Sequence, residues 1–413
     1  MAVRTLTPHF YVVPAWLAWS FGPLLRSLQY RPEDKRDLRL DLLRGFCVFA
    51  MIVDHIGGSS WLYALTGGNR WLISAAEGFV FLSGVTMGLV YAQRIARNGL
   101  RASAWAIFHR ATTLYLLTVG LTLLFALLAL YTDVRLWTDR SYGIGVDSLP
   151  ELLVGTLTLH FSYHGTDILV LYTLLLAASP AILFFLTEGK TLQVVSASWG
   201  LWALNLLFPD QATLTWDIVN AAYFPLPAWQ VLFVGGLVLG YHRDSIAKLL
   251  DEARRGLADR QEVMDLAARG LVVPLVALTV VTISRTSGLA ARLGTVYLEP
   301  DLLSDLFTKP GLGPGRLALF FLAMALLYAL ATWLWRPLDR GVGWLLIPLG
   351  QTALYGYTMQ FAAILVLYNF GAALGIASDD PASRLLNSAA QLASVMAIWA
   401  MVRHRVLFAV VPR

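Results

Sequence analysis

The stretch LRLDLLRGFCVFAMIVDHIGG, residues 38–58, is an apolar run that contains Asp41, Arg44, Asp54 and His55. It has the length of a membrane-spanning helix, which needs about 20 mainly apolar residues. Ionisable groups inside such a helix are costly and indicate a functional site. Arg44 and His55 are eleven positions apart, which on an α-helix places them on one face and about 16 Å apart along the axis. The stretch therefore predicts a first span with a polar face.

The composition makes lipid the expected solvent for most of the chain. Of the 413 residues, 57% are hydrophobic and 14% are charged, whereas soluble domains carry about 25% charged residues. The net charge of +5 could suit a nucleic acid. Because membrane topology accounts for most of that charge, no nucleic-acid partner is expected. The single cysteine, Cys47, lies in an apolar run, so neither a disulfide framework nor a thiolate metal cluster is expected.

Apolar runs recur along the chain and predict an all-α polytopic membrane protein with about ten transmembrane helices. Their centres fall near residues 48, 81, 121, 176, 199, 234, 278, 326, 358 and 393. Most Lys and Arg then lie in segments on one side, which places both termini in the cytoplasm. We expect an interfacial and cytoplasmic segment at 1–36, a transmembrane domain at 37–405 and a cytoplasmic tail at 406–413.

The second apolar run, WLISAAEGFVFLSGVTMGLVYA, contains another acid, Glu77. If this helix starts on the outer side, Glu77 lies about two turns in, at the depth of His55. Gly84 and Gly88 would let the first two helices approach closely. A carboxylate from Glu77 or Asp54 would orient His55 and make it more basic, which suits the abstraction of a proton from a hydroxyl group.

Simpler interpretations of these polar positions stay open. His55 could only cap the helix end, with Asp54 solvated at the interface, and Arg44 could serve as a positive-inside anchor. The outer loops are rich in aromatic residues, which could stack on sugars or form the aromatic belt of a membrane protein.

The stretch HFSYHGTDILVLYTLLLAASP adds weaker candidates at the outer mouth of a later span. Asp167 is expected either to line an outer cavity or to cap the helix, and Tyr172 lies deeper. His160 and His164 precede Asp167, but no metal site is expected, because Gly165 interrupts the helix and no further nitrogen ligand follows.

Several of these segments resemble a known family. RGFCVFAMIVDH, an Arg followed by ten residues and a His, resembles the first-helix signature of membrane acyltransferases of the acyltransferase-3 type. RDLRLDLLRGF, SAAEGFVFLSGVTMGLVY, PLPAWQVLFVGGLVLGY and LGQTALYGYTMQF resemble the OpgC family, which succinylates osmoregulated periplasmic glucans. The resemblance runs from about residue 36 to about residue 405. One departure is Gln360, because related proteins often have a His near this point.

The resemblance implies a ten-helix O-acyltransferase of a bacterial inner membrane. It would take an acyl group from cytoplasmic acyl-CoA and esterify a hydroxyl of a periplasmic glucan. The family name implies that the acyl group is succinyl. The motif residues fall on Arg44, His55 and Glu77, and no tightly bound cofactor is implied. His55 would be the general base, and an acyl-histidine intermediate is the rival chemistry. The predicted catalytic residues are therefore His55, Glu77 and Asp54.

The remaining candidates are expected to bind substrate. Arg44, Ser83 and Tyr172 are candidate oxyanion donors, Asp41 lies on nearly the same face as Arg44, and Asp167 would line the acceptor side. The CoA phosphates are expected at an inner basic loop with Arg94, Arg97 and Arg101.

Two other functions remain possible at this stage. A proton-coupled transporter or flippase would use His55, Glu77 and Asp167 as a proton relay. A scaffold subunit for glucan synthesis would keep its function when His55 is replaced by Ala. The oligomeric state, the acyl group and the acceptor cannot be deduced from the sequence.

Overall fold

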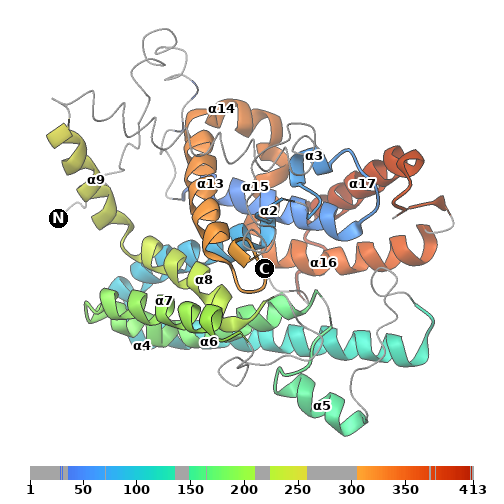
Figure 1. The fold of residues 1–413 in the computed structure, drawn as a ribbon, viewed down its shortest axis with the longest axis horizontal. Coiled ribbons are helices and arrows are strands. Elements are labelled where there is room, and N and C mark those ends of the chain that lie inside the picture. Colours follow the sequence, from blue (N-terminus) through green and yellow to red (C-terminus); the bar gives the residue numbers. More distant parts are fainter. Residues whose placement is uncertain are drawn as a thin grey trace.

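The computed structural model describes residues 36–134, 148–209, 224–257 and 305–409, apart from positions 70, 164, 372–373 and 377, together with Leu28, Tyr30 and Val411. Regular structure in this part of the chain is helical (Figure 1). The α-helices are α2 Leu38–Ile56, α3 Tyr63–Thr66, α4 Ala75–Tyr131, α5 Leu149–Leu157, α6 Asp167–Thr187, α7 Thr191–Leu207, α8 Leu226–Tyr241, α9 Arg243–Leu257, α13 Pro314–Trp333, α14 Trp335–Leu338, α15 Trp344–Gln351, α16 Ala353–Val366 and α17 Arg384–Arg403. Short π-helical turns, Asp339–Gly343 and Leu367–Gly371, and a 3₁₀ turn, Pro381–Ser383, adjoin them.

Four segments of the described chain are long and apolar enough to cross a membrane: α4, α6, α13 and Pro381–Arg403. Each predicted span centre lies in a described helix, except the one at 278, which falls outside the described residues, as does the predicted interfacial segment before residue 28. The all-helical membrane character is confirmed. The count of ten spans and the cytoplasmic placement of the termini stay predictions.

Helix α2 lies at the centre of the described bundle and packs against α4, α13, α15, α16 and α17 (Figure 1). It begins after Asp37, whose side chain accepts a hydrogen bond from the backbone N–H of Arg39. Its crossing with α15 is close, because a Cβ at Gly45 would collide with the carbonyl oxygen of Leu346. This contact fixes the depth of Arg44, the neighbour of Gly45.

The pair Gly84 and Gly88 packs against α8 and not against α2, so the predicted partner helix was wrong. A Cβ at either position would collide with a carbonyl oxygen of α8, on Phe233 or Leu237. Helix α8 has its own small residues at the contact, and a Cβ at Gly240 would collide with the carbonyl oxygen of Val85. Small residues on both helices allow backbone contact, and only one of the two sets was recognised from the sequence.

The predicted inner loop with Arg94, Arg97 and Arg101 is helical instead. Helix α4 runs through it and is interrupted only at Gly99, which has φ 78° and ψ 165°. Side chains before and after Gly99 line the same cavity, so the chain folds back at this residue. Only glycine adopts this backbone conformation readily. A sharp turn at Gly99 therefore takes the place of the predicted loop.

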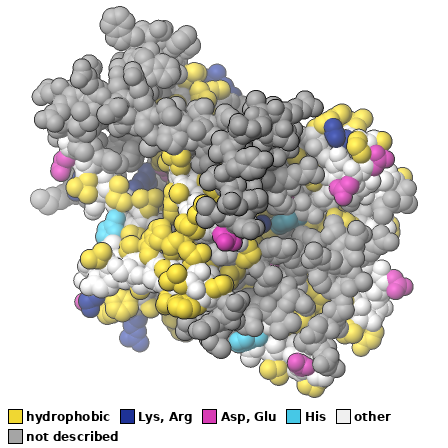
Figure 2. All heavy atoms as spheres, viewed as in Figure 1, with side chains coloured by type: hydrophobic (Ala, Val, Ile, Leu, Met, Phe, Trp, Pro, Cys, Tyr) yellow, Lys and Arg dark blue, Asp and Glu magenta, His cyan; other side chains and the backbone are white. Residues whose placement is uncertain are grey.

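The outer surface of the bundle is apolar where lipid is expected. On the face shown in Figure 2, hydrophobic side chains gather over α7 and α8. Helix α7 exposes Leu192, Trp199, Leu204 and Leu207, and Leu192 is 76% exposed. Large exposed apolar faces are unfavourable in water but favourable against acyl chains. The charged segment after α8 forms helix α9, which Figure 1 shows projecting from the bundle.

Candidate active site

A cavity of about 860 Å³ opens between α2, α4, α6, α8 and the start of α16. Arg36, Arg110, Arg243 and His109 line one end, where Arg36 pairs with Asp41 and Arg243 with Asp37, both carboxylates of the same lining. Farther in, the lining becomes aromatic and apolar. The deep wall is formed by Phe79, Ser83, Leu169, Tyr172 and Phe233. A cavity of this size suits a large ligand with an anionic head and an apolar stem.

Several predicted binding residues meet in this cavity, namely Asp41, Arg44, Ser83 and Tyr172. Arg44 donates to Thr86 Oγ1 at 3.0 Å and to the carbonyl oxygen of Gly350 at 2.6 Å. Its buried Nε has no hydrogen-bond partner among the described residues. This unpaired donor is an exception among buried polar atoms, which are normally paired.

The predicted phosphate-binding residues are placed elsewhere. Arg94, Arg97 and Arg101 are exposed, and the cavity lining does not include them. Arg110, later on the same helix, does line it. The fold-back at Gly99 explains the difference, because it turns the first three side chains to the outside of the bend while bringing the second half of α4 to the cavity.

A cluster around Asp37 closes the N-terminal end of α2. Arg39 donates to Asp37 at 2.9 Å and 2.8 Å, Tyr328 at 2.9 Å and Arg243 at 3.2 Å. Arg39 also lies over the rings of Tyr30 and Tyr328, 4.3 Å and 4.4 Å from their centroids. Burial alone would raise the pKa of Asp37, but the hydrogen bonds and charges of these partners lower it below its ordinary value of 3.8. This Asp37 cluster is a fully paired structural unit.

Three aromatic rings separate the deep end of the cavity from His55. Tyr172 donates to the carbonyl oxygen of Phe79 at 2.8 Å, and the two rings meet edge to face with centroids 5.4 Å apart. Phe79 lies 6.2 Å from the ring of Tyr357, which lies 6.4 Å from the ring of His55. His55 is not part of the cavity lining. These rings form an aromatic partition between the cavity and the imidazole.

The contacts recorded for His55 and Glu77 differ from the predicted pairing. His55 Nδ1 lies 3.2 Å from Oε1 of Gln360. Glu77 is fully buried, pairs with Arg316 of α13 and accepts from the backbone N–H of Ser74 at 2.9 Å. The prediction that Glu77 orients His55 therefore gains no support from these contacts.

The predicted position of Glu77, two turns into its helix, was wrong. Helix α4 begins at Ala75, so Glu77 lies in the first turn and forms a capping box with Ser74. The signal was present in the sequence as Ser74-Ala-Ala-Glu77, the spacing of a capping box. Its cationic partner, Arg316, was missed, because it follows the Gly-rich turn in GLGPGRLALF, whose composition is typical of a loop.

Around Lys309, on the loop before α13, the structure collects three predicted acids, Asp54, Glu77 and Asp167, as its charged neighbours. Burial lowers the pKa of Lys309. Asp54 accepts from Thr66 Oγ1 at 2.5 Å. Asp167 is fully buried and accepts from the backbone N–H groups of Gly165 and Ile168 through Oδ1. Its Oδ2 has no hydrogen-bond partner among the described residues.

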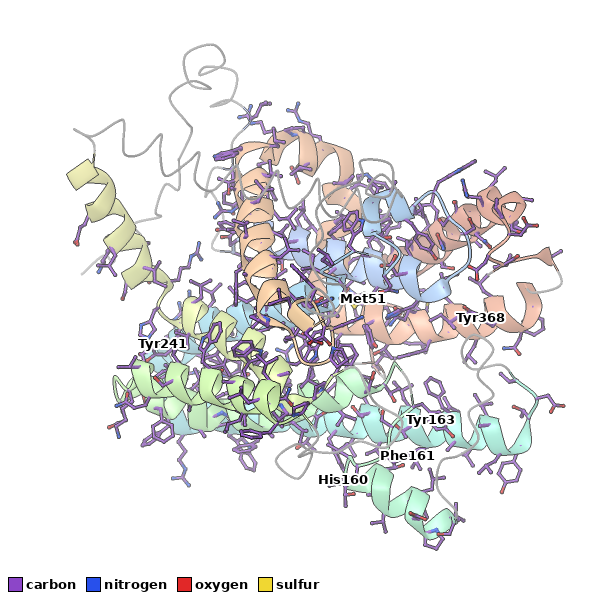
Figure 3. All side chains as sticks on the ribbon, in the orientation of Figure 1. Met51, His160, Phe161, Tyr163, Tyr241 and Tyr368 are labelled. Carbon is purple, nitrogen blue, oxygen red and sulfur yellow. The ribbon has the colours of Figure 1, made fainter. Side chains whose placement is uncertain are left out.

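The segment before α6 lies apart from α2. Figure 3 shows His160, Phe161 and Tyr163 together between α5 and α6, while Met51 of α2 lies near the centre of the bundle. His160 is exposed and bonds to Thr158. His164 lies outside the described residues. Within the described part of the chain, no three His, Cys, Asp or Glu side chains are grouped as metal ligands.

The described residues thus form a helical membrane protein with a cavity lined by arginines and aromatic rings, and an aromatic partition separates this cavity from a histidine. The chain belongs to the OpgC protein family, whose model matches residues 36–408. This is a family of glucan succinyltransferases, so the protein is an acyltransferase. No curated protein and no solved structure matches the chain.

Proposed function

We propose that the protein transfers a succinyl group from succinyl-CoA, bound from the cytoplasm, to a hydroxyl of a periplasmic glucan. The observation that carries this proposal is the cavity, which is basic at one end and reaches the aromatic partition next to His55 at the other. Family membership supplies the acyl group and the class of acceptor. In the bacterial inner membrane the protein can reach succinyl-CoA from the cytoplasm and the glucan from the periplasm.

The donor's anionic groups fit the basic end of the cavity. Arg110 would hold the phosphates there, helped by Arg36 and Arg243, which would share their hydrogen bonds between the phosphates and their present partners Asp41 and Asp37. The pantetheine stem would then lie along the apolar wall past Arg44. Opening of the contact between Phe79 and Tyr357 would admit the thioester to His55.

The chemical step assigns general-base catalysis to His55. Its unprotonated nitrogen takes the proton of the glucan hydroxyl while the hydroxyl oxygen attacks the thioester carbonyl carbon. The C–S bond then breaks, the ester forms, and the CoA thiolate leaves and takes the proton from the imidazolium. A positioned base typically contributes about 10² to 10⁴-fold to the rate of such a step. Asp54 and Asp167 would bind acceptor hydroxyls.

Proton-coupled transport is less well supported. It would need a relay through His55, Glu77 and Asp167, but the recorded bonds of Glu77 go to Arg316 and Ser74, and those of Asp167 go to backbone N–H groups. The family assignment also favours an enzyme.

The test is mass spectrometry of periplasmic glucans from cells that lack the native enzyme and carry either wild-type protein or His55→Ala at matched membrane abundance. We expect succinyl ester with the wild type and none with His55→Ala. His160→Ala, which alters an exposed histidine of another segment, is the control and should retain full ester content. Unchanged ester in His55→Ala would refute the catalytic assignment.

A further inference from the structure

The environment of Gln360 concerns how His55 is held, and it rests on the proposed function. Gln360 lies on α16 and is fully buried. Its Oε1 is 3.2 Å from His55 Nδ1. With the Gln360 amide placed so that its oxygen faces the ring, this oxygen accepts and Nδ1 carries the proton. The other ring nitrogen, Nε2, is then the one with a lone pair.

A second contact from the same helix face fixes the plane of the imidazole. Tyr357 is three residues before Gln360, so both side chains lie on one face of α16. The rings of Tyr357 and His55 meet edge to face, at an interplanar angle of 80°. The Tyr357 hydroxyl is itself held, because it donates to the carbonyl oxygen of Gly165. One helix face thus determines both the orientation and the tautomer of the ring.

The other half of the Gln360 amide argues against a purely structural role. Its Nε2 is buried without a hydrogen-bond partner among the described residues. Leaving a buried donor unpaired costs roughly 1–3 kcal/mol, so a residue selected only for packing would be apolar here. By contrast, Gln230, another buried glutamine, pairs its amide with Ser198 through both ends.

We propose that Gln360 is the positioning residue of the transfer reaction, holding His55 as the Nδ1–H tautomer so that Nε2 faces the reacting hydroxyl. The charged groups on the surrounding elements include Asp54, Glu77, Asp167 and Lys309. Asp54 on α2 bonds to Thr66, and Glu77 on α4 pairs with Arg316 on α13. In the contact with Gln360, the group that orients the base is a neutral amide.

The proposal is tested with the full-length protein in lipid nanodiscs, using succinyl-CoA and glucan extracted from cells lacking the enzyme, with transfer measured from pH 5 to 9. Gln360→Leu removes the acceptor at similar volume, and we expect kcat to fall about 10²-fold with the KM for succinyl-CoA changed less than about twofold. Gln360→Glu keeps an acceptor but adds a negative charge that stabilises the imidazolium. It should stay active, with the acidic limb of its pH profile moved to higher pH.

Gln230→Leu is the matched control for loss of a buried amide and should leave the pH profile unchanged. The inference is overturned if Gln360→Leu, folded and at full abundance, keeps wild-type kcat, or if Gln360→Glu leaves the acidic limb in place. If either Gln360 result occurs while His55→Ala loses all transfer, the role of Gln360 is refuted and the role of His55 stands. Full transfer in His55→Ala would refute the catalytic role of His55, and absence of transfer by the wild-type protein would refute the proposed function itself.

Discussion

The Asp37 cluster and the path from Arg44 to His55 are both polar regions inside the bundle, but they are paired to different degrees. In the Asp37 cluster, both carboxylate oxygens accept from Arg39, and Arg243 and Tyr328 add further bonds. Along the path, Arg44 Nε and Gln360 Nε2 lack hydrogen-bond partners among the described residues. Because buried polar atoms are nearly always paired, we infer that the first region stabilises the fold and the second is kept available for substrates.

The largest expected effect is on stability, from Asp37→Asn. Removing this charge leaves Arg39 buried without its counter-charge, which costs about 3–5 kcal/mol of unfolding free energy. Thermal unfolding of the purified protein in detergent should show a clear drop in Tm. Asp379→Asn, at an exposed carboxylate, is the control and should leave Tm unchanged. An unaltered Tm in Asp37→Asn would mean that the cluster does not hold the fold.

The ion pair of Glu77 and Arg316 offers a sharper comparison, because Glu77 is predicted to be catalytic and is found in a paired state. Glu77→Gln and Arg316→Gln should each destabilise the protein, whereas the double variant should lose less than the sum, with a coupling of about 0.5–3 kcal/mol. If the double variant is folded and still transfers succinyl, Glu77 is structural. A folded double variant without transfer would return Glu77 to the catalytic group.

The pH dependence of stability should follow Asp37. Its folded pKa is lowered, so its contribution is fully present above the ordinary value of 3.8 and is lost as the pH falls through the lower folded value. Wild-type Tm should therefore decrease more steeply than that of Asp37→Asn as the pH is lowered below about 4. Parallel decreases in the two proteins would show that other carboxylates dominate acid unfolding.

The smallest effect is expected at the mouth of the cavity. Arg110→Ala removes a lining guanidinium and should raise the KM for succinyl-CoA about threefold to tenfold with kcat little changed, as for loss of a solvent-accessible charged contact. Arg97→Ala, on the same helix but away from the cavity lining, should not alter KM. If Arg97→Ala raised the KM more than Arg110→Ala, the phosphates would bind at the exposed arginines instead.

Much of the fold followed from local patterns, whereas the site depended on contacts between distant segments. The apolar run around Arg44 and His55 predicted α2 correctly, and the glycine pattern at Gly84 correctly indicated a close helix contact. Periodicity cannot name the partner helix, however, so that contact was assigned to α2 in place of α8. Likewise, Gln360 is 305 positions from His55, and nothing in either local sequence links them.

The most direct test of the account is a cryo-electron microscopy structure of the full chain in nanodiscs with a non-reactive thioether analogue of succinyl-CoA. We predict that the phosphates lie at Arg36, Arg110 and Arg243 and that the carbon corresponding to the thioester carbonyl lies beyond Phe79, leaving room for a hydroxyl oxygen about 3 Å away from it beside His55 Nε2. An analogue bound outside this cavity, or one whose acyl end points away from His55, would contradict it.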